Sequence, residues 1–85
     1  MKMVNEIAKI VTEKDKESIS DIFLRQKNKT ETEAKRFTDT DKNDLRVLFN
    51  LWAKYMPKHK QNWGCGGCRQ LVNNFWYKVN QVYNN

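Results

Sequence analysis

Hydrophobic side chains recur at three- and four-residue steps in several stretches of this 85-residue chain, which is the spacing of amphipathic helices. No stretch alternates β-branched with polar residues, and no Asn-Gly or Asp-Gly pair marks a hairpin turn. The pattern therefore predicts an all-α fold.

The widest apolar stripe lies in residues 40–56 and centres on Trp52. Thr38 or Thr40 can cap this helix, and aspartates in its first turn suit the positive end of the helix dipole. Pro57 ends the helix, because the residue before a proline avoids α geometry. The stripe consists of Leu45, Val47, Leu48, Phe49, Leu51, Trp52, Tyr55 and Met56.

A second stripe predicts a helix over residues 67–83. Tyr77 points away from its inner face. That face consists of Leu71, Val72, Phe75, Trp76, Val79, Val82 and Tyr83. Joined by a short loop, the two helices are predicted to form an antiparallel pair, about 40–56 and 67–83.

The chain divides into a charged helical arm, residues 1–36, and a basic, aromatic helical core, residues 37–85. Ser18-x-x-Asp21 resembles a capping box, but no Gly or Pro forces a break, so the arm is predicted as one helix or two. It completes a three- or four-helix arrangement either in cis or by oligomerisation. Its apolar positions are Val4, Ile7, Ala8, Val11, Ile19, Ile22 and Phe23.

The net charge of +6 arises wholly in the second half of the chain. Residues 1–44 carry ten basic and ten acidic side chains, whereas residues 45–85 carry six basic and no acidic ones. Eight of the ten aromatic residues also lie there, which favours an anionic partner such as nucleic acid or a nucleotide. We expect phosphate contacts from Lys54, Lys58, Lys60, Arg69 and Lys78, and base stacking on Trp63 and Tyr77.

The segment NWGCGGCRQ, residues 62–70, holds both cysteines and all three glycines. Cys65 and Cys68 form half of a zinc site, which His59, the only histidine, and one further ligand would complete; alternatively, two copies would share four cysteines. A redox dithiol is disfavoured, because the thioredoxin motif that it resembles follows a β-strand. The third interpretation is a tight glycine turn with Cys68 packed in the core. We favour a structural corner, with or without zinc, over a catalytic centre.

No catalytic arrangement is predicted, so the protein is expected not to be an enzyme. His59 has no acid beside it, all carboxylates precede residue 45, and there is neither a P-loop nor a dinucleotide fingerprint. A chain of this size also has little room for an enclosed active site. No apolar run reaches the ~18 residues of a membrane span, and the N-terminal residues do not resemble a signal peptide, which predicts a cytoplasmic protein.

Residues 38–83 resemble a type of small protein found in tailed-bacteriophage genomes. The matching residues are Thr38, Thr40, Leu45, Leu48, Trp52, Cys65, Cys68, Arg69 and Phe75. The resemblance implies an accessory or virion protein in infected bacterial cytoplasm and no particular activity. The charge and the aromatic residues of the second half leave two functions open: binding of a nucleic-acid backbone or a small anionic nucleotide, or contact with phage or host proteins through the aromatic helical face.

Overall fold

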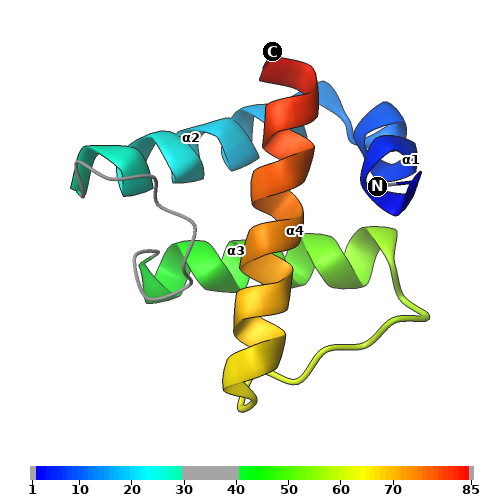
Figure 1. Ribbon diagram of the computed structural model, residues 1–85, viewed down its shortest axis with the longest axis vertical. Coiled ribbons are helices and arrows are strands. Elements are labelled where there is room, and N and C mark those ends of the chain that lie inside the picture. Colours follow the sequence, from blue (N-terminus) through cyan, green and yellow to red (C-terminus); the bar gives the residue numbers. More distant parts are fainter. Residues whose placement is uncertain (1, 30–40, 85) are drawn as a thin grey trace.

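The computed structural model describes residues 2–29 and 41–84, and every regular element in those ranges is a helix. This confirms the all-α prediction. The predicted caps Thr38 and Thr40 lie outside the described residues. The helices are α1 (Lys2–Ile10), α2 (Glu13–Lys29), α3 (Lys42–Tyr55) and α4 (Gly66–Asn84) (Figure 1).

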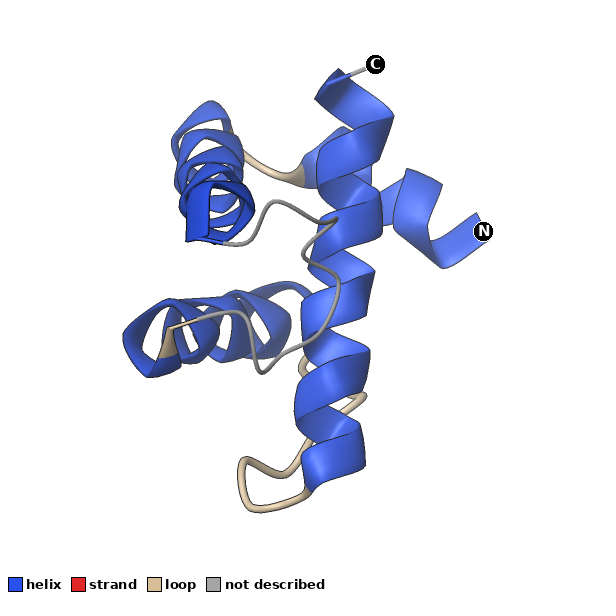
Figure 2. Ribbon diagram, turned by 60° about the vertical axis from the view of Figure 1, so that its left-hand side comes forward, coloured by secondary structure: helices blue, strands red, loops and turns tan. Residues whose placement is uncertain are grey.

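Helix α4 is the axis of the fold, because each of the other three helices packs against it. Figures 1 and 2 show α2 and α3 crossing α4 steeply at different heights, with α1 beside the half of α4 that carries its C-terminal end. The predicted pairing of α3 with α4 is thus present as a crossed pair. The two helices meet near their centres, where the indole N–H of Trp76 donates a hydrogen bond to the carbonyl of Leu48 at 3.0 Å.

Apolar stripes from all four helices meet in one core around Trp76 and Leu48, which are completely buried. The rings of Phe75 and Tyr55 contact Trp76 edge-on, with centroids 5.1 Å and 6.2 Å away. The arm packs in cis against α4. All of its predicted apolar residues are buried: Val4, Ile7, Ala8, Val11, Ile19, Ile22 and Phe23.

The described part of the arm, residues 2–29, forms two helices, which break at Thr12. The Thr12 hydroxyl accepts a hydrogen bond from the Asp15 amide at 3.2 Å, and the Thr12 amide donates to the Tyr55 hydroxyl at 3.2 Å. The predicted cap at Ser18 is wrong: Ser18 lies inside α2 and donates to the carbonyl of Lys14. Thr12 caps instead because a contact from α3 also holds this turn in place.

Two ion pairs among the described residues join α2 to α3. Arg25 donates to both carboxylate oxygens of Asp44, at 2.8 Å and 3.2 Å. Lys54 donates to Asp15 at 2.8 Å, and the Tyr55 hydroxyl donates to the same carboxylate oxygen. None of the helices in the described ranges has the length and apolar character needed to cross a membrane.

Candidate functional site

The loop between α3 and α4, residues 56–65, is anchored at its first turn. Met56 is buried, and its amide donates to the carbonyl of Trp52 at 2.7 Å. The His59 amide donates to the Met56 carbonyl at 3.1 Å, and the His59 carbonyl accepts a hydrogen bond from the Trp52 indole. These contacts leave the side chains of Lys58 and Lys60 exposed on the outside of the loop.

The other end of the loop leads into α4 through a turn at Asn62. The side-chain oxygen of Asn62 accepts a hydrogen bond from the Gly64 amide at 2.9 Å, and the backbone carbonyl of Asn62 accepts one from the Cys65 amide at 3.1 Å. None of the three glycines has a positive φ. Glycine-rich turns often use positive φ angles, which only glycine adopts readily. This turn does not use them.

Cys65 occupies the cap position of α4. Its carbonyl accepts from the Arg69 amide at 3.0 Å, and its sulfur accepts from the Cys68 amide at 3.2 Å. Hydrogen bonding from the Cys68 side chain, and then from its amide, holds the pKa of the Cys65 thiol below its ordinary value. Both cysteines are unpaired and half-buried, so Cys68 is not fully buried in the core as the turn interpretation predicts.

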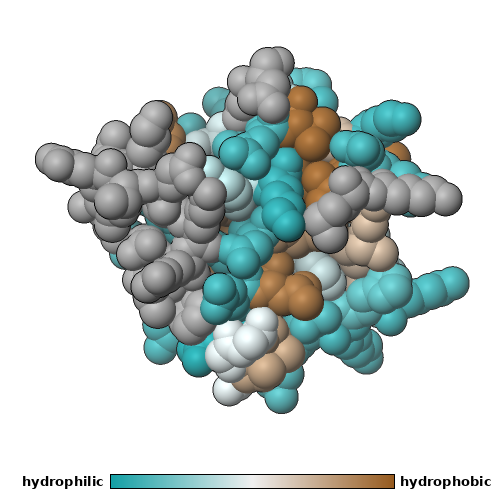
Figure 3. Space-filling view, viewed as in Figure 1, coloured by the Kyte–Doolittle hydropathy of each residue, from teal (hydrophilic) through white to brown (hydrophobic). Residues whose placement is uncertain are grey.

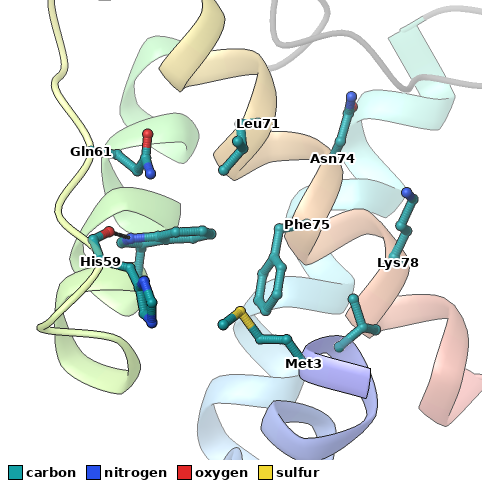
Figure 4. A pocket seen from close by; sticks show the side chains of 9 residues that line it. Met3, His59, Gln61, Leu71, Asn74, Phe75 and Lys78 are labelled. Carbon is teal, nitrogen blue, oxygen red and sulfur yellow. Dashed lines mark hydrogen bonds between the residues drawn. The ribbon is translucent and has the colours of Figure 1, made fainter. Parts of the chain in front are cut away.

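His59 does not join the cysteines in a ligand set. Among the described residues, no three His, Cys, Asp or Glu side chains are placed to hold one metal ion. Figure 4 shows the His59 ring lining a groove beside α4, together with Met3 and Phe75. A tetrahedral zinc site formed by His59, Cys65 and Cys68 of one chain is therefore not present in the part of the chain described.

The predicted anion-binding cations do not share one environment. The Lys54 side chain pairs with Asp15, which raises the pKa of Lys54 and lowers that of Asp15. Lys58 and Lys60 are exposed and pair with no described carboxylate. Lys78 is exposed further along α4, and Arg69 is half-buried in its first turn.

The two predicted stacking residues lie apart and are only half-exposed. Trp63 packs edge-on against Phe49, with ring centroids 5.0 Å apart, and the guanidinium of Arg46 lies over its ring at 4.5 Å. Tyr77 packs against Phe23 of α2 at 5.6 Å. Arg46 was missing from the predicted site, and no spacing signal could identify it, because its position over Trp63 depends on the path of the loop.

A groove of about 420 Å³ runs between α1, α3, α4 and the loop. The surface of the groove is mostly apolar. It includes the side chains of Leu71 and Met3, which are 47% and 40% exposed. The prediction that Leu71 belongs to the inner face is wrong, because α1 and α3 leave this side of α4 uncovered. Figure 3 shows apolar surface along α4 between hydrophilic side chains. The lining residues are Met3, Val4, Trp52, His59, Gln61, Leu71, Asn74, Phe75 and Lys78.

The groove also contains one unsatisfied polar atom. The side-chain oxygen of Asn74 is buried and accepts no hydrogen bond from the described residues, although a buried carbonyl normally has a donor. In Figure 4, Asn74 and Lys78 lie on α4, across the groove from His59 and Gln61.

No protein-family model, characterised protein or solved structure matches this chain. The resemblance to small bacteriophage proteins therefore stays a prediction.

Proposed function

We propose that this protein is a non-catalytic accessory protein that binds a nucleic-acid backbone through a cationic corner, comprising Arg46, Lys58, Lys60, Trp63 and Arg69, with Lys78 as an outer contact. The observation that carries this proposal is the exposure of Lys58 and Lys60 on an anchored loop within a half of the chain that contains no carboxylate.

Two acidic side chains on α2 and α3 form ion pairs with cations outside this set. Asp15 pairs with Lys54, and Asp44 pairs with Arg25. Lys54 is therefore removed from the phosphate-binding set, since a phosphate would have to displace Asp15 to reach it.

Arg46 supplies a cation held in a defined orientation. Its guanidinium is stacked on Trp63 at 4.5 Å, and a planar guanidinium can present two N–H groups to one phosphate. The stacking limits the rotation of a long side chain, so less conformational entropy is lost when phosphate binds. The same contact covers part of Trp63, which weakens the case for Trp63 as a base-stacking surface.

Salt dependence gives a quantitative test. Five cations remain after Lys54 is excluded, so the log–log slope of duplex affinity against salt should be no steeper than about −4.5. Fluorescence anisotropy with labelled duplex and single-stranded oligonucleotides would measure this slope.

The decisive variant is Lys58→Glu/Lys60→Glu, with Lys9→Glu/Lys14→Glu as its matched control. Both double variants change the net charge equally, and all four lysines are exposed. The loop variant should lose affinity for all sequences alike and flatten the slope by about 2, because phosphate contacts do not read sequence. Equal loss in the control would place the contact elsewhere, and no binding at low salt would refute the proposal.

The groove favours a second function, contact with a phage or host protein. Its exposed apolar lining and the adjacent Lys78 suit a bulky apolar side chain on an acidic helical segment. Leu71→Glu should abolish binding of an acidic amphipathic peptide. Val82→Glu, at a 43% exposed position of α4 that does not line the groove, should not.

A further inference from the structure

The cysteine pair is an incomplete metal site within one chain. Cys65 lies at the cap position of α4 and Cys68 in its first turn, both reduced and half-buried, and the Cys65 sulfur lies 3.2 Å from the Cys68 amide. Structural zinc sites normally have four protein ligands, and the described residues supply no third one here. Two thiolates are therefore available, and two ligands are missing.

The position of the pair leaves it open to another molecule. Figures 1 and 2 show the first turn of α4 extending beyond α3 at one end of the molecule, with only the loop beside it. Cys65 lies between two glycines, and Cys68 lies between Gly67 and Arg69; a Cβ on Gly67 would lie 3.9 Å from the Cys65 sulfur. A second copy can therefore approach the pair without displacing a helix, and the glycines beside Cys65 add no side chain to this face.

We propose that two copies of this chain bind one Zn²⁺ between them, each supplying Cys65 and Cys68 as thiolate ligands. The site is complete only when the second copy contributes its pair. This inference does not depend on nucleic-acid binding.

The charges around the pair suit such a site. Binding of Zn²⁺ by four thiols releases four protons and leaves a complex with a net charge of −2. The positive ends of two α4 helices and the Arg69 side chain of each copy face that charge. A guanidinium nitrogen of Arg69 would lie 4.0 Å from a Cβ on Gly66, which places this cation in the turn that holds the cysteines. The complex therefore offsets part of the repulsion between two chains that each carry +6.

The experiment is a titration of reduced, metal-free full-length protein with ZnCl₂. Native mass spectrometry and sedimentation should show a species of twice the 10.2 kDa chain mass, containing one zinc per two chains. A chelator should return it to the monomer. Co²⁺ in place of zinc should give the visible absorption of a tetrahedral thiolate complex.

The variants distinguish this site from other zinc binding. Cys65→Ser and Cys68→Ser should each abolish zinc-dependent dimerisation, and circular dichroism would verify that the helices remain. His59→Ala should leave the dimer and its zinc unchanged. One zinc per monomer, a dimer that forms equally without zinc, dimerisation that survives both cysteine variants, or no zinc binding would each overturn the proposal.

Discussion

Trp76 should contribute more to stability than any exposed residue of α4. Its side chain is completely buried, contacts the rings of Phe75 and Tyr55, and donates to the Leu48 carbonyl. A buried tryptophan removes roughly 150–250 Å² from water, which at about 25 cal/mol per Å² amounts to about 4–6 kcal/mol as an upper estimate. Trp→Ala substitutions in cores cost about 3–5 kcal/mol. We therefore expect Trp76→Ala to lose about 3–5 kcal/mol.

This loss is large against the total stability of the protein. At about 0.05–0.15 kcal/mol per residue, an 85-residue domain has roughly 4–13 kcal/mol in all. Trp76→Ala could therefore unfold a large share of the molecules, so a milder variant is needed as well. Trp76→Phe keeps an aromatic ring but removes the indole N–H and should cost about 1–3 kcal/mol.

Urea unfolding followed by far-UV circular dichroism measures both variants without depending on tryptophan fluorescence. Val82→Ala is the control on the same helix, since Val82 is 43% exposed, and it should cost less than about 1 kcal/mol. If Trp76→Ala costs no more than Val82→Ala, α3 and α4 do not cross at this side chain, and the arrangement of the core is wrong.

Three further predictions concern single contacts. Thr12→Ala should destabilise the protein by about 1 kcal/mol in urea unfolding, and Thr12→Ser should not; equal effects would show that the hydroxyl does not cap α2. Lys54 lowers the pKa of Asp15, so this pair stabilises the fold above about pH 4 and the stabilisation is lost as pH falls through the folded pKa. Asp15→Asn should thus flatten the acid side of the stability–pH curve, and an unchanged curve would contradict the pairing. Cys65 should react with iodoacetamide faster than Cys68 at neutral pH, as read by peptide mapping, and Cys68→Ala should slow it; the reverse order would rule out the assigned hydrogen bonds.

Periodicity predicted the helices of this fold well, because burial on one face requires apolar residues every three or four positions. The stripe around Trp52 predicted the bounds of α3 to within two residues. The apolar positions of the arm correctly identified its buried side chains. Periodicity says which face is buried and does not say at what angle the partner crosses. Leu71 and Val82 are consequently half-exposed, although they continue the stripe of α4.

The candidate site was less predictable, since its contacts join residues far apart in the chain. The pairing of Lys54 with Asp15 and the stacking of Arg46 on Trp63 follow from how α2, α3 and the loop meet. Ser18 and Thr12 carry similar capping signals in the sequence, and a contact from Tyr55 is what distinguishes them. The charge asymmetry, in contrast, could be read directly from the sequence, because it depends only on where the charged residues stand along the chain.

The dependence of every helix on α4 has a consequence for how the protein is made. α1, α2 and α3 are synthesised before the α4 surface against which they pack. From Ile10 to Asn84 the ribosome adds roughly 75 residues, which takes about 4–15 s at ordinary elongation rates. Until α4 is complete, the apolar faces of the helices already made lack the surface that buries them. Folding should therefore begin only when α4 emerges, and a ribosome stalled before Trp76 should display an unfolded, protease-sensitive chain.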